Sequence, residues 1–115
     1  MKLPNRHEAI VSEEKITGYL LSDSQHQGRH KAAFFRHFGF SVDDWQVLVE
    51  ALRAHVMEHV VARTSDSPHG IRYTVEGELT TPQGRRPLVR TVWIVDHGTD
   101  IPRLVSAYPL ARRSE

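Results

Sequence analysis

The sequence of 115 residues contains no cysteine. This absence excludes disulfide bonds, thiol catalysis and thiolate-bound metal sites, and it agrees with a reducing cytoplasm, where we expect the protein to act. No run of about 18 apolar residues is present, so we expect no membrane-spanning helix. Residues 1–15 also lack the apolar segment of a cleaved signal peptide. The sequence therefore gives no reason to expect a membrane partner.

The chain has little excess charge of either sign, with a formal net charge of +1. This balance argues against broad, non-specific binding of nucleic acid, and we expect no DNA partner. The positive charges are mostly arginine, which supplies 12 of the 15 Lys and Arg residues. Its planar guanidinium suits bidentate contacts to phosphate, although a high-GC coding bias would produce the same enrichment.

The length predicts a single domain, residues 1–115, with one modest core. Apolar residues recur at helical spacing in the first half of the chain and alternate with polar residues after residue 70. This change of period predicts an α+β fold, with three N-terminal helices packed on a C-terminal antiparallel β-meander. We expect residues 1–62 to be mainly helical and residues 70–110 to form the sheet. The expected helices cover residues 13–21, 29–38 and about 42–61, and the expected strands cover residues 71–79, 88–95 and 103–108.

The second expected helix opens with three consecutive basic residues, Arg29, His30 and Lys31, directly after Gly28. A helix N-terminus carries unpaired N–H donors and partial positive charge, so each basic side chain there costs about a few tenths of a kcal/mol. The first turn contains no acidic residue. Because folding alone does not explain this choice, we predict an anion-binding site, suited to phosphate, at this helix start.

Arg90 interrupts the most apolar of the expected strands. A charge in such a strand must be paired, exposed on an open face, or used to bind a ligand. Strand alternation places Arg90 on one face and Thr91 on the other, together with Trp93. Both faces cannot be open, so either Arg90 or Thr91 is structural unless a β-bulge reorients it.

Cleavage of RNA without a metal ion requires a base for the 2′-hydroxyl proton, cations for the phosphorane and an acid for the leaving oxygen. His30 is a candidate for the base or the acid because an imidazole titrates near neutral pH. The structural alternative is that Arg90 pairs with Glu76 or Glu78. We expect no cofactor. The predicted catalytic residues are His30, Lys31, Arg90, Thr91 and Tyr108, and the predicted substrate-binding residues are Arg29, Arg103 and Ser106.

A second pattern is His55-Val56-Met57-Glu58-His59, which matches the H-x-x-E-H spacing of inverted zincins. A hydrolytic zinc site also needs a third ligand from a downstream helix, and the rest of the chain has the pattern of strands. His55 and His59 also lie beside the apolar stripe of the third expected helix. We therefore predict that this pair packs half-buried in the fold and assign no metal ligands, with a zinc protein that uses His55 and His59 as the minor alternative.

The chain contains, in one register over nearly its whole length, the segments Leu3–Asn5, Lys15–Ser22, Gly28–Ala32, Phe38–Phe40, Val89–Ile94 and Pro102–Tyr108. These segments resemble an uncharacterised bacterial domain family that is similar to the C-terminal modules of contact-dependent polymorphic toxins. The order of its elements is similar to that of the barnase–EndoU–colicin–RelE group of ribonucleases. The resemblance implies a sheet face that cleaves RNA without metal, through His30, Lys31, Arg90, Thr91, Ser106 and Tyr108.

Two functions of different classes are compatible with these residues. The first is a metal-independent ribonuclease toxin of a bacterial toxin–antitoxin or toxin–immunity pair, whose partner is a small acidic antitoxin or immunity-type protein. The second is a non-catalytic binding module of the same fold, which uses its basic helix start to hold an acidic partner protein. RNA is the expected partner in the first case alone.

Overall fold

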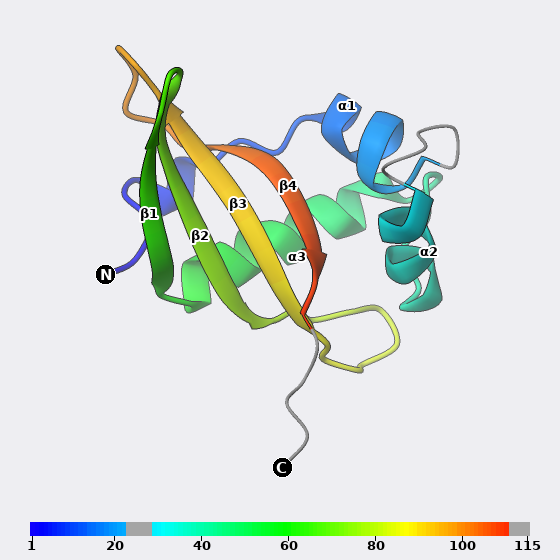
Figure 1. Cartoon of the computed structure of the whole chain (residues 1–115). Coiled ribbons are helices and arrows are strands. Elements are labelled where there is room, and N and C mark those ends of the chain that lie inside the picture. The colour runs from blue at the N-terminus through cyan, green and yellow to red at the C-terminus, as the bar shows by residue number, and fades with distance from the viewer. Residues whose placement is uncertain (23–28, 111–115) are drawn as a thin grey trace.

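The computed structural model describes residues 1–22 and 29–110, without the side chains of Arg29 and His30. Within these residues it is an α+β fold whose four strands form one antiparallel sheet (Figure 1). The helix α3 crosses behind the sheet, and α2 lies beyond the edge formed by β4. The elements are η1 (Arg6–Glu8), α1 (Glu13–Lys15), η2 (Ile16–Leu20), α2 (Arg29–His37), α3 (Trp45–Glu58), β1 (Val61–Ser67), β2 (Gly70–Glu78), β3 (Leu88–Asp96) and β4 (Arg103–Pro109).

The expected helix over residues 13–21 is present, and it begins as its sequence predicts. The Ser12 hydroxyl accepts a hydrogen bond from the Lys15 N–H at 3.1 Å, which satisfies one of the open donors of the first turn. From Ile16 the chain winds more widely, as the π-helical turn η2. This turn buries Ile16 and Leu20 in the core and leaves Tyr19 half-buried.

The sheet begins earlier than the sequence pattern predicts. We expected the third helix to run to about residue 61 and the sheet to begin after residue 70, but α3 ends at Glu58 and β1 begins at Val61. The strand β1 lies at an edge of the sheet, and its residues from Ala62 to Asp66 are exposed. The alternation that reveals a half-buried strand is therefore absent. The sequence pattern predicted three strands, and this was wrong, because the sheet has four.

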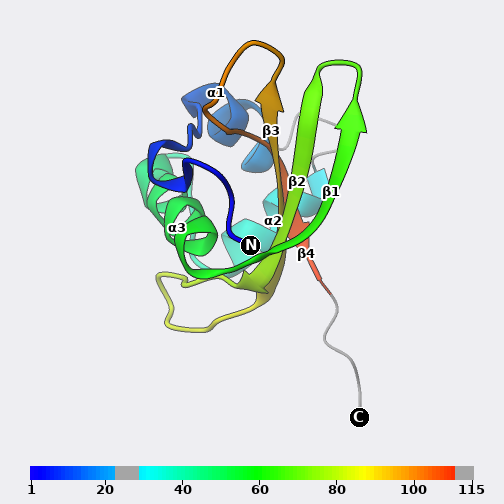
Figure 2. The ribbon, with the colours of Figure 1, turned by 90° about the vertical axis from the view of Figure 1, so that its left-hand side faces the viewer.

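The strands follow one another as a meander in the order β1-β2-β3-β4. Glu76 lies opposite Arg90 on β3, and Arg90 lies opposite Tyr108 on β4, so these side chains share one face of the sheet. Figure 2 shows the sheet nearly edge-on, with α1, α3 and the N-terminal segment on one side of it. The core fills that side. Its largest fully buried side chains include Trp93, Phe35, Leu48, Leu52 and Val75.

Among the described residues, no helix is both long enough and apolar enough to cross a membrane.

Candidate functional site

The two neighbouring candidates Arg90 and Thr91 lie on opposite faces of β3, and the structure decides between them. Thr91 is fully buried, and its hydroxyl accepts a hydrogen bond from the Trp93 indole N–H at 2.8 Å. Arg90 faces the other side, where its side chain is 35% exposed. Thr91 therefore packs in the core, and Arg90 is available to a ligand.

His55 joins the same buried network. Its Nε2 lies 3.3 Å from the Gly77 carbonyl and 3.2 Å from the Val89 carbonyl, while its Nδ1 lies 3.3 Å from the Thr91 hydroxyl. These partners fit a neutral ring that donates from Nε2 and accepts at Nδ1. Burial lowers the pKa of His55 to about 4, because the charged ring would lose its hydration.

His59 completes the predicted H-x-x-E-H pattern but is engaged elsewhere. Its Nε2 lies 2.9 Å from the Glu78 carbonyl, and its ring centroid lies 4.9 Å from that of His55. Within residues 1–22 and 29–110, no three His, Asp or Glu side chains are grouped so that they could hold a metal ion. Both rings of this pair are hydrogen-bonded to backbone carbonyls of the sheet, as the predicted packing role requires.

The ammonium group of Lys31 is the centre of a cluster at the β4 edge of the sheet. It donates to the Tyr19 hydroxyl at 2.6 Å and to the Ser106 hydroxyl at 3.0 Å. It also lies 4.8 Å from the centroid of the Tyr19 ring and 5.5 Å from that of Tyr108. Residues from η2, α2 and β4 thus converge on one cation.

Arg90 extends this cluster along the sheet. Its Nε donates to a Glu76 carboxylate oxygen at 2.6 Å, which is the pairing that the structural alternative describes. Its Nη1 reaches the Tyr108 hydroxyl at 3.5 Å, and its guanidinium lies 5.5 Å from the centroid of the Tyr108 ring. Hydrogen bonds to Tyr108 and Glu76 raise the pKa of Arg90, which keeps it charged. The ion pair between Arg90 and Glu76 neutralises part of the positive charge and fixes the direction of the guanidinium.

Tyr19 is a site residue that the sequence reasoning did not select. The hydrogen bond donated by Lys31 lowers the pKa of the Tyr19 phenol, because it stabilises the phenolate. A tyrosine with a lowered pKa is a better proton donor than an ordinary tyrosine. Nothing in the local sequence of Tyr19 indicates this role. Its partner Lys31 lies 12 positions further along the chain, and Ser106, which shares the Lys31 ammonium, lies 87 positions from Tyr19.

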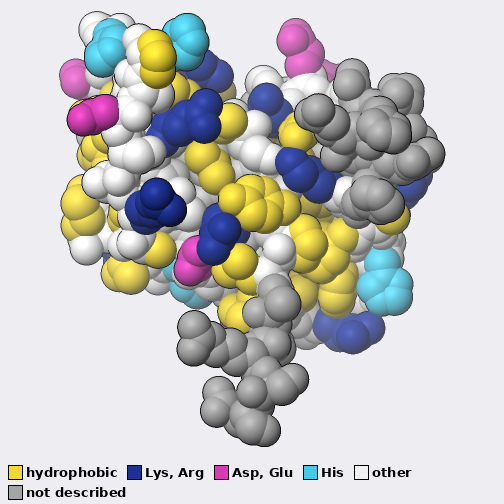
Figure 3. All heavy atoms as spheres, viewed as in Figure 1, with side chains coloured by type: hydrophobic (Ala, Val, Ile, Leu, Met, Phe, Trp, Pro, Cys, Tyr) yellow, Lys and Arg dark blue, Asp and Glu magenta, His cyan; other side chains and the backbone are white. Residues whose placement is uncertain are grey.

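A groove of about 380 Å³ runs from this cluster across the open face of the sheet. Its cationic side chains are Arg63, Arg72 and Arg90, and Glu76 is the acid among them. Figure 3 shows Lys and Arg side chains spread over this face of the molecule, with few acidic ones. The sequence reasoning missed Arg63, because it did not predict β1, and it did not single out Arg72.

The remaining predicted residues lie elsewhere or outside the description. Arg103 forms a two-point ion pair with Asp96, at 2.7 and 3.0 Å, five positions before Tyr108 on β4. That separation is about 17 Å along an extended strand. Arg29 and His30 begin α2, but their side chains lie outside the described residues. The structure therefore brings together Lys31, Arg90, Ser106 and Tyr108, and it places Thr91 and Arg103 apart from them.

Residues 2–111 match the family described as a domain of unknown function, DUF6883. The chain belongs to this family. A search of functionally curated proteins finds no match. Among solved structures, the DUF6883 chain is similar to a chain of a contact-dependent growth inhibition toxin–immunity protein complex from Klebsiella pneumoniae 342. The TM-score is 0.68 at 14% sequence identity, over 88% of this chain and 99% of the other. This likeness shows a shared fold.

Proposed function

We propose that the protein is a metal-independent ribonuclease of the toxin class, with its active site at the Lys31 cluster. The observation that carries the proposal is the position of the Lys31 ammonium, which is held between two hydroxyls and lies 5.5 Å from the ring centroid of Tyr108, a residue of the arginine-lined groove. Cations and proton-transfer groups are what cleavage of a phosphodiester requires. The exposed groove offers an extended RNA strand a path across the sheet.

In the proposed reaction, the 2′-oxygen of the substrate attacks the adjacent phosphorus and the bond to the 5′-oxygen breaks. The 2′-hydroxyl proton passes to a base, for which His30 next to Lys31 remains our candidate. Lys31 and Arg90 contact the phosphate oxygens and stabilise the charge that develops on them. The Tyr19 phenol, whose pKa is lowered, gives its proton to the leaving 5′-oxygen. The products are a 2′,3′-cyclic phosphate and a 5′-hydroxyl end.

A neutralising protein partner belongs to the same proposal. The similar fold comes from a complex of a growth inhibition toxin with its immunity protein. The groove of this chain carries an excess of arginine over acid. An acidic antitoxin or immunity-type protein that covered the groove would pair with these cations and exclude RNA.

The proposal is tested with purified protein and fluorescent synthetic RNAs in buffer containing a metal chelator. We expect wild type to cleave RNA and to leave 2′,3′-cyclic phosphate ends. The variant Lys31→Met should lose about 100-fold or more of this activity, because it removes a cation from the phosphate site. Lys2→Met is the matched control, since Lys2 is exposed and its ammonium donates to the Met57 carbonyl at 3.2 Å, away from the cluster.

Two results would overturn the proposal. One is cleavage by Lys31→Met at the wild-type rate. The other is the absence of any cleavage by folded wild type across RNAs of varied sequence and structure, which would favour the non-catalytic binding module. Expression in bacteria without a partner gives an independent readout, since the toxin should arrest growth and Lys31→Met should not.

A further inference from the structure

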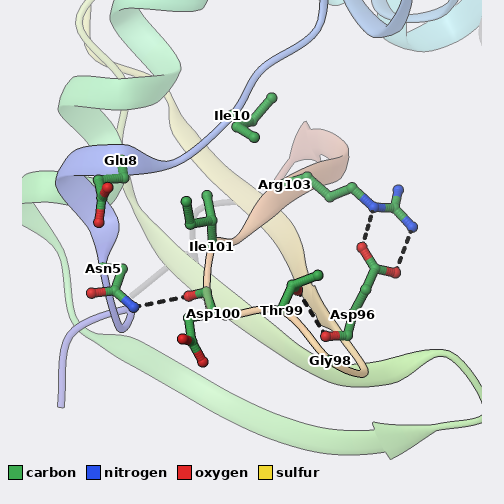
Figure 4. Close-up of a pocket in the computed structure, with 9 residues that line it drawn as sticks. All are labelled: Asn5, Glu8, Ile10, Asp96, Gly98, Thr99, Asp100, Ile101 and Arg103. Atoms are coloured by element: carbon green, nitrogen blue, oxygen red, sulfur yellow. Dashed lines mark hydrogen bonds and ion pairs between the residues drawn. The ribbon is translucent and has the colours of Figure 1, made fainter.

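A second pocket, of about 640 Å³, lies away from the groove and is not used by the proposed ribonuclease. It is formed by the N-terminal segment around η1 and by the loop that joins β3 to β4 (Figure 4). Arg103 marks its border at the start of β4, about 17 Å along the strand from Tyr108. The two sites therefore lie at opposite ends of β4.

The walls of this pocket are fixed by hydrogen bonds between distant parts of the chain. The Asn5 side-chain amide donates to the Asp100 carbonyl at 2.9 Å, 95 positions away. The Ile10 N–H donates to the Pro102 carbonyl at 2.9 Å, and the Leu104 N–H donates to the Ile10 carbonyl at 2.9 Å. A site held in this way loses little conformational entropy when it binds a partner.

The floor of the pocket is apolar. Ile10 is 51% exposed and Ile101 is 37% exposed, and Figure 4 shows the two side chains close together between the N-terminal segment and the loop. Exposed branched side chains that adjoin one another in a hollow are typical of a surface that contacts another protein.

The rim of the pocket is acidic. Glu8 and Asp100 contribute carboxylates, and in the described part of the chain neither forms an ion pair. Asp96 differs, because both of its oxygens are occupied by Arg103. Two negative charges without partners beside an apolar floor are complementary to a long cationic side chain, whose methylenes pack on isoleucine while its charged end reaches the carboxylates.

We propose that this pocket is the docking site for a partner protein, which inserts one arginine or lysine side chain between Glu8 and Asp100. The methylene stem of that side chain lies on Ile10 and Ile101, together with an apolar neighbour from the partner. The carboxylates repel nucleic acid, so this surface is separate from the arginine-lined groove. The assignment is independent of ribonuclease activity.

The test uses a short peptide as the probe, acetyl-Leu-Arg-Leu-amide, added to isotope-labelled protein and followed by NMR. A matched peptide replaces arginine by citrulline, which has the same shape without the charge. We expect the arginine peptide to shift the amide signals of Glu8, Ile10 and residues 98–101 with a dissociation constant of about 1 mM. The citrulline peptide should bind about 10-fold more weakly.

The double variant Glu8→Gln, Asp100→Asn should lose the shifts produced by the arginine peptide and keep the wild-type fold, because both substitutions are at exposed, unpaired side chains. Asp43→Asn changes an exposed acid that does not line the pocket, and it should bind as wild type does. Three results would overturn the proposal: no shifts at about 10 mM peptide, equal binding of the citrulline peptide, or shifts that survive in the double variant.

Discussion

Replacement of His55 by glutamine should remove much of the acid sensitivity of the fold. In the folded protein the pKa of His55 is about 4, whereas a histidine in the unfolded chain titrates near 6.5. As the pH falls below about 6.5 the unfolded chain takes up a proton that the folded protein does not, so the free energy of unfolding decreases. The decrease continues until the pH reaches the folded pKa. A difference of about 2.5 pKa units corresponds to about 3 kcal/mol.

The size of this effect follows from the contacts of the ring. Protonation at Nδ1 would charge a group that is 1% exposed, and it would remove the acceptor that faces the Thr91 hydroxyl. Glutamine keeps an N–H donor for the Gly77 and Val89 carbonyls but cannot take up the proton. We expect the variant to be less stable by about 1–2 kcal/mol at pH 7, because one buried hydrogen bond is lost.

The measurement is urea unfolding followed by tryptophan fluorescence at pH 7.5, 6.5, 5.5 and 4.5. Trp93 is a suitable reporter, because its indole contacts Thr91 within the same network. The wild type should lose most of the 3 kcal/mol over this range, and His55→Gln should show a much flatter dependence. His7→Gln is the control, since His7 is exposed and is not a partner of the His55 ring, and it should retain the wild-type slope. An unchanged slope in His55→Gln would refute the assignment of the acid sensitivity to this ring.

Two further predictions concern the site and the sheet. If Tyr19 donates the proton to the leaving oxygen, Tyr19→Phe should reduce the rate of RNA cleavage by about 100-fold. The pH–rate profile of this variant should also lose the titration of a phenol. The control Tyr73→Phe should leave the rate and the pH–rate profile unchanged. Full activity in Tyr19→Phe would exclude that role. Gly70→Ala should destabilise the protein by about 2 kcal/mol or more in urea unfolding, because a Cβ there meets the Val95 carbonyl and backbone must shift. Gly77→Ala should cost less, since the three atoms nearest to its Cβ belong to the His59 side chain, which can move, and not to backbone. Equal losses in the two variants would contradict this reasoning.

Most of the fold could be predicted from the sequence because burial imposes a period on it. The helical segment formed by α1 and η2, the helix α2, and the strands β2, β3 and β4 each have a buried face and appear at nearly the expected positions. The strand β1 could not be predicted in this way, because an edge strand with exposed residues on both faces has no such period. Serine and threonine in this strand gave the impression of a polar loop.

The site was predictable only in part, for a different reason. Strand alternation shows that Arg90 and Thr91 face opposite ways, but the buried face is decided by where α3 packs. The pair of Arg103 with Asp96 could have been anticipated from two opposite charges across a short hairpin. The contacts of Lys31 with Tyr19 and Ser106 could not, since they join three elements across the whole chain.

The buried His55 ring also has a consequence for the opposite side of the sheet. Its Nε2 approaches the carbonyls of Gly77 and Val89, which lie opposite one another on β2 and β3. The next pair in the register is Glu76 and Arg90, the ion pair of the groove. The His55 side chain of α3 therefore contacts the backbone of both β2 and β3 at the residue pair next to Glu76 and Arg90. The alignment of a surface charge pair thus depends on a residue that no solvent and no ligand can reach.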